Sequence, residues 1–138
     1  MIKEFIPYDQ ALLLKELGFN DECIQYYAPG HPEGYYLRSR ENALNNTHWM
    51  FVDDGDGKGR DKLCTAPLYQ QAFRWFRETY NLEGEVHCIR FNSKRLKGYQ
   101  YAITSQNYQK FEQLGNYDTY EEAELACLNK LIEIVKNK

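Results

Sequence analysis

Residues 119–136 read TYEEAELACLNKLIEIVK and predict the helix around which the fold is organised. Thr119 can cap the N-terminus of this helix, and Glu122, three residues later, completes a capping box. Carboxylates in the first turns and lysines at the end match the helix dipole. Apolar side chains follow at helical spacing, at Leu125, Leu128, Ile132 and Val135. We therefore expect a helix over 119–136 that buries one apolar face.

Before this helix, three runs rich in aromatic and β-branched residues predict strands. They cover 86–91, 99–104 and 108–114. The connection over 92–98 contains Asn, Ser, Lys and Gly, which favour a turn. The sequence therefore predicts an antiparallel meander of three strands.

The stretch 66–78 reads APLYQQAFRWFRE and predicts a second main helix, over 67–80. Thr65 can cap this helix, and Pro67 suits its first turn because no backbone N–H is needed there. Asn81 and Gly84 are expected to end it. Its apolar face is expected to comprise Leu68, Ala72, Phe73, Phe76 and Tyr80.

The N-terminal half has shorter signals. A helix is expected from about Tyr8, closed by Gly18. Tyrosine-rich runs at 23–27 and 35–37 flank a Pro-Gly turn and predict a hairpin. A polar loop over 39–47, a short apolar strand over 49–52 and a Gly- and Asp-rich flexible loop over 53–62 are expected to follow.

Together these elements predict an α+β fold. We expect an antiparallel sheet of four to six strands packed against two main helices, plus a short N-terminal helix. The length of 138 residues fits a single domain over 1–138. Within it we expect an N-terminal helix and hairpin region over 1–65 and a helix-meander-helix unit over 66–138.

Charge and hydropathy exclude several classes of protein. The net charge of -3 argues against a surface built as a whole to neutralise phosphate. No apolar run approaches the length of a membrane span, and the first residues do not resemble a secretory signal, so we expect a cytoplasmic protein without membrane contact. The four cysteines form no Cys-x-x-Cys pair and are expected to be reduced.

The motifs for metal binding and catalysis fail on inspection. Residues 53–62 read DDGDGKGRDK and begin like an EF-hand loop, but Lys58 stands where an oxygen ligand is needed and Thr65 where a bidentate Glu is needed. The three histidines lack ligand spacing, and no Gly-x-Ser-x-Gly elbow is present. We expect no metal, no cofactor and a non-catalytic protein, while a catalytic site assembled from distant residues stays open.

One segment has an unusual charge. Residues 86–110 carry five basic and no acidic side chains. Basic and aromatic side chains that could contact phosphate and stack on bases are combined there: Arg90, Lys94, Arg95, Lys97, Tyr99 and Tyr101. The alternative is that the aromatic rings face the core and the basic residues protect a sheet edge from aggregation.

A second candidate surface lies on the helix over 67–80. Arg74, Trp75 and Arg77 fall off its main apolar stripe, and Trp and Arg are enriched at binding hot spots. These residues could form a patch for another protein or for self-association. The alternative is that Trp75 widens the contact of the helix with the core.

From residue 66 onward, the order helix, three strands, helix resembles the double-stranded RNA-binding domain. In that family the start of the last helix carries lysines that grip phosphates. Here the same place reads Tyr-Glu-Glu-Ala-Glu over 120–124, and carboxylates repel a phosphate backbone. The resemblance therefore implies a topology and transfers no RNA-binding residue.

A second resemblance rests on APLYQQAFRWFRE (66–78) and TYEEAELACL (119–128). These stretches are similar to a group of small uncharacterised proteins from bacterial and phage or prophage genomes. The likeness implies a phage or prophage setting and offers no catalytic residue. From the sequence we expect a non-catalytic protein-binding or accessory protein; the alternative is a nucleic-acid-binding protein that uses residues 86–110.

Overall fold

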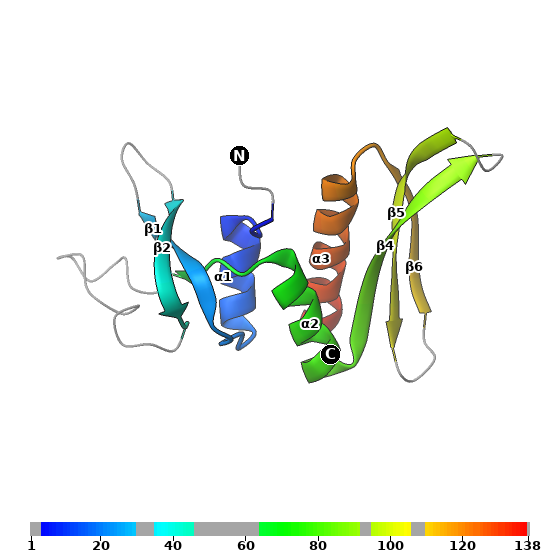
Figure 1. The fold of residues 1–138 in the computed structure, drawn as a ribbon. Helices are drawn as coiled ribbons and strands as arrows, with labels where there is room; N and C mark the ends of the chain where they lie inside the picture. The colour runs from blue at the N-terminus through cyan, green and yellow to red at the C-terminus, as the bar shows by residue number, and fades with distance from the viewer. Residues whose placement is uncertain (1–3, 30–34, 46–63, 92–94, 106–109, 138) are drawn as a thin grey trace. The chain divides into compact units, whose positions relative to one another are not determined.

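The computed structural model describes residues 4–29, 35–45, 64–91, 95–105 and 110–137. By its internal contacts the chain forms two compact units, Met1–Leu68 and Tyr69–Lys138. From the sequence we expected one domain with a subdivision at residue 65. That position lies three residues before the boundary between these units. The α+β class is confirmed, but the expectation of one sheet with four to six strands is wrong. Among the described residues, each unit has its own antiparallel sheet of three strands instead. Figure 1 shows the two sheets as separate.

The first unit begins with the expected short helix. Helix α1 covers Tyr8–Glu16, and the chain leaves it through Gly18 at a φ of +102°. The amide of Phe19 donates to the carbonyl of Leu14 at 2.9 Å, and that of Gly18 donates to Lys15 at 3.1 Å. These two bonds form a Schellman motif, which requires a left-handed residue and so favours glycine.

The first sheet confirms the predicted hairpin. Strand β1, Cys23–Pro29, pairs with β2, Tyr35–Ala43, and with β3, Cys64–Thr65. Because β2 continues to Ala43, the predicted loop over 39–47 is wrong in its first half. The strand over 49–52 and the loop over 53–62 lie outside the described residues.

The second unit begins with helix α2, Tyr69–Tyr80. Thr65 does not cap this helix, because Thr65 belongs to β3 and pairs there with Tyr26 of β1. Asn81 ends the helix as expected, with a φ of +57°. Gly84, which was expected in the same role, lies within the next strand.

The predicted meander and last helix are confirmed. Strands β4, Leu82–Phe91, β5, Arg95–Ser105, and β6, Lys110–Tyr117, are neighbours in that order. Helix α3 covers Tyr120–Lys136, and the Thr119 hydroxyl accepts a bond of 3.1 Å from the amide of Glu122. Figure 1 shows α2 and α3 on the same side of this sheet.

Apolar packing between α3 and the sheet forms the core of the second unit. The buried residues of α3 are Ala123, Cys127, Leu128, Leu131, Ile132 and Val135. Opposite them, Gly84 permits close approach, since a Cβ there would lie 2.8 Å from the Sγ of Cys127. Leu82, Tyr101 and Ile103 contribute buried side chains from β4 and β5. The positions between the packed ones on β4, Glu83, Glu85 and His87, are exposed.

Candidate functional site

The structure separates the candidate residues on α2. Arg74 and Arg77 are exposed, as a binding patch requires. Trp75 is 8% exposed, and its ring lies edge-on to those of Phe76 and Tyr80, with centroids 5.0 and 5.4 Å away. Trp75 therefore belongs to the core, and its expected place off the apolar stripe is corrected. The apolar face of α2 includes Trp75, because its indole packs against the rings of Phe76 and Tyr80.

The candidates on the meander are also divided. Arg90 is exposed and Tyr99 is half-buried. Tyr101 is 5% exposed, and burial raises the pKa of its phenol to about 12, so it packs in the core rather than offering a stacking surface. Lys94 lies outside the described residues. Arg95 and Lys97 are in β5, but their side chains lie outside the described part.

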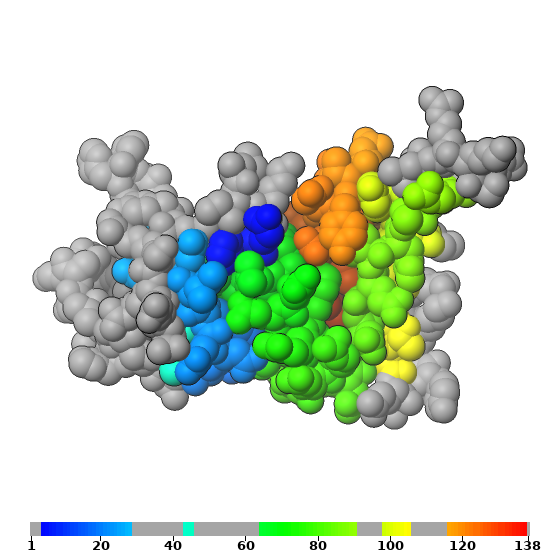
Figure 2. Space-filling view, viewed as in Figure 1, coloured from blue at the N-terminus to red at the C-terminus, as the bar shows by residue number. Residues whose placement is uncertain are grey.

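Tyr99 belongs to a group of tyrosines that the sequence analysis did not assemble. It pairs across the sheet with Tyr117. The Tyr120 ring stands edge-on to it, with centroids 5.8 Å apart and planes at 87°. Tyr120 is 44% exposed, and Figure 2 shows the first turns of α3, in orange, at the surface beside β4 and β5. We call Tyr99, Tyr117 and Tyr120 the tyrosine surface.

Carboxylates lie at one side of the tyrosine surface. Glu121 is exposed and Glu124 is half-buried, both in the first turns of α3. Burial, and then the charge of Glu121, raises the pKa of the Glu124 carboxyl to about 7. Burial followed by the charges of nearby groups, Glu124 first, also raises the pKa of the Tyr120 phenol. Tyr120 therefore lies in a negative electrostatic environment.

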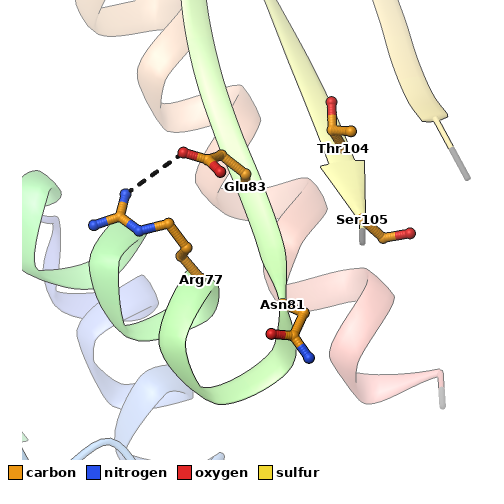
Figure 3. Close-up of a pocket in the computed structure, with 5 residues that line it drawn as sticks. All are labelled: Arg77, Asn81, Glu83, Thr104 and Ser105. Carbon is orange, nitrogen blue, oxygen red and sulfur yellow. Dashed lines mark ion pairs between the residues drawn. The ribbon is translucent and has the colours of Figure 1, made fainter. Parts of the chain in front are cut away.

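A small cleft lies elsewhere in the second unit (Figure 3). It has a volume of about 220 Å³ and is lined by Arg77, Asn81, Glu83, Thr104 and Ser105. The Arg77 side chain extends toward Glu83, and the ion pair between them measures 3.7 Å. Both side chains are about half exposed, so this pair contributes little stability. Because its two charges balance, the cleft has no marked preference for an anion or a cation.

The described side chains offer little for catalysis. Within the described ranges, no group of three or more His, Cys, Asp and Glu residues could hold a metal ion. Burial raises the thiol pKa of Cys23 to about 11 and those of Cys64 and Cys127 to about 12, so these three cysteines are poor nucleophiles. No helix in the part of the chain that the structure describes has the length and apolarity of a membrane span.

Comparisons with protein-family models, curated proteins and solved structures found no match to this chain. The two resemblances inferred from the sequence therefore stay predictions. The element order of the second unit, one helix, three antiparallel strands and one helix, is confirmed.

Four residues of this site were not predicted from the sequence: Tyr117, Tyr120, Glu121 and Glu124. One signal could have found Glu124, because it precedes the buried Leu128 by four residues and so continues the apolar stripe of α3. An ionisable side chain in line with a buried stripe has a perturbed environment. Tyr120 lies one further turn back on the same side, but its contact with Tyr99 comes from a distant strand.

Proposed function

We propose that this chain is a non-catalytic binding or accessory protein, of phage or prophage origin, that recognises another protein. Its contact site is the tyrosine surface, and its ligand is a segment of the partner that carries Arg or Lys side chains. The observation that supports this proposal is Tyr120, 44% exposed and edge-on to Tyr99 beside two carboxylates.

The chemistry of this site favours a cationic group. Tyrosine is enriched at binding hot spots, and the face of its ring attracts a guanidinium or ammonium. Glu124 is partly desolvated with no basic group among the causes of its shifted pKa. A cation from a partner would supply an opposite charge to this carboxyl and would favour its ionised form.

The same charges oppose a nucleic-acid ligand at this place. Glu121 and Glu124 act on Tyr120, and Glu83 and Glu85 are exposed on β4 beside the basic segment. Carboxylates in these positions repel phosphate. These charges favour a protein ligand over a nucleic acid, and the experiment below compares the two.

Short Arg- or Lys-containing peptides, matched acidic peptides and single-stranded RNA and DNA oligonucleotides provide the test. Binding is followed by the NMR shifts of residues 117–124. We expect shifts with basic peptides alone, and Tyr120→Ala should remove them while Tyr120→Phe retains them. Ile24→Ala is the matched control, since Ile24 is the other large apolar residue found exposed among the described residues. Equal binding by Tyr120→Ala, or binding of oligonucleotides alone, would contradict the proposal.

A further inference from the structure

Strand β4 lies at an edge of the second sheet. The strand order β4-β5-β6 gives it β5 as its neighbour on one side. Helix α2 contacts the beginning of β4, where Arg77 pairs with Glu83. Farther along the strand Glu85, His87 and Cys88 are all exposed. An edge strand presents backbone N–H and C=O groups that can pair with another strand.

One face of β4 exposes two carboxylates, Glu83 and Glu85, followed by the imidazole of His87. Glu85 and His87 lie two residues apart and therefore on the same face of the strand. The Nε2 of His87 is 3.1 Å from the Oε2 of Glu85, and both side chains are about half exposed. The two groups thus already form one attractive contact within the strand.

The order of these side chains along β4 favours one register for pairing with an identical strand. In an antiparallel pair, directly opposed residues share a face, so a symmetric pair of β4 strands is centred on one residue. Centring on Glu85 sets His87 opposite Glu83, which already pairs with Arg77, and also opposes two Glu85 carboxylates. Centring on His87 opposes two imidazoles. Centring on Val86 places each Glu85 opposite His87 of the second copy, which gives two attractive contacts related by symmetry.

We propose that the partner of this edge is a second copy of the chain, paired antiparallel through β4 with Val86 at the two-fold axis. The pairing joins two three-stranded sheets into one of six strands. Backbone hydrogen bonds supply attraction, as in other strand additions, and the two Glu85–His87 contacts specify the register. The pairing does not involve the tyrosine surface, so it can fail without affecting the proposed function.

Charge exchange tests the electrostatic part of the proposal. Sedimentation velocity over a series of concentrations measures the dimer dissociation constant. Glu85→Lys and His87→Glu should each weaken dimerisation by about tenfold, equivalent to about 1.4 kcal/mol. The double variant exchanges the two signs and should restore the wild-type constant. Glu78→Lys, an exposed change on α2, is the matched control and should leave it unaltered. Circular dichroism checks that each variant folds.

A wild-type chain that stays monomeric at all concentrations overturns the proposal. A dimer that both single variants retain unchanged, or that the double variant does not restore, also overturns it.

Cross-linking tests the register. In a Cys88→Ser background, Val86→Cys places two thiols at the two-fold axis, where opposed Cα atoms are within disulfide range. Oxidation with copper phenanthroline should cross-link this variant rapidly. Glu85→Cys and His87→Cys, which correspond to the two rejected registers, should cross-link at least about tenfold more slowly. Equal rates for the three variants, or no cross-link at Val86→Cys, would refute the register.

Discussion

The backbone amide of Thr65 donates a hydrogen bond of 2.8 Å to the side-chain carbonyl of Asn45. The side-chain amide of Asn45 in turn donates to the carbonyl of Phe19, also at 2.8 Å. Asn45 is 5% exposed, so one buried side chain connects the segment after α1, the segment after β2 and the last residue of β3.

Asn45→Ala should therefore lower the free energy of unfolding by about 2–4 kcal/mol, because it leaves a buried amide and a buried carbonyl without partners. Urea denaturation followed by circular dichroism measures the change. Glu16→Ala, at an exposed residue of α1 in the same unit, is the control and should cost less than about 0.5 kcal/mol. Equal costs for the two variants would show that the Asn45 bonds do not stabilise the unit.

Gly84→Ala should lower the free energy of unfolding by about 1–3 kcal/mol, because the added methyl would lie 2.8 Å from Cys127 Sγ and 3.2 Å from Leu131 Cδ1. Cys127→Ala opens space at that contact. In a double-mutant cycle, the cost of both changes together should be smaller than the sum of their separate costs. Strict additivity would argue against the contact.

Trp75→Ala should cost about 3–5 kcal/mol of stability, as expected for truncation of a buried aromatic side chain. Arg74→Ala changes the neighbouring exposed residue and should stay within about 0.5 kcal/mol. Thermal and urea unfolding measure both. A Trp75→Ala protein of wild-type stability would show that Trp75 does not contribute to the core.

The four thiols should differ sharply in reactivity. Cys88 is exposed, whereas Cys23, Cys64 and Cys127 are buried with raised pKa values. Because the thiolate is the reactive form, a thiol-specific disulfide reagent at pH 8 should modify one cysteine rapidly and the other three only in denaturant. Cys88→Ser should abolish the rapid phase. Rapid modification of more than one thiol in the folded protein would contradict this assignment of burial.

The pH dependence of stability should reveal Glu124. Its carboxyl pKa is raised from 4.5 to about 7, so the folded state binds the proton more tightly than the unfolded state does. The resulting stabilisation is fully present below pH 4.5 and is lost as pH rises to about 7. Glu124→Gln should therefore be more stable than wild type at pH 8, by on the order of 1 kcal/mol after allowance for solvent screening.

At pH 4 the advantage of Glu124→Gln should vanish, because the wild-type carboxyl is then protonated in both states. Urea midpoints measured across this pH range would decide the matter. Identical dependence of the urea midpoint on pH for Glu124→Gln and wild type would contradict the raised pKa of the Glu124 carboxyl.

Elements with strong local signals were predicted well. The capping residue Thr119, the glycine at position 18 and the left-handed Asn81 act within a few residues of the chain, and each ends or begins a helix as expected. The burial of Trp75 was left open because two faces of α2 carry aromatic rings and the spacing fits both. The extra length of β4, back to Leu82, was missed because Gly84 resembles a helix stop until Cys127 is placed against it.

By itself, the sequence determined the α+β fold class, the three-stranded meander and the limits of the last helix. Periodicity and capping depend on near neighbours along the chain. Only the tertiary structure decided that the strands divide into two sheets, that Tyr101 faces inward and that Tyr120 stands against Tyr99. Those outcomes depend on which distant segments exclude water from one another, and contacts between distant segments leave no periodic trace in either one.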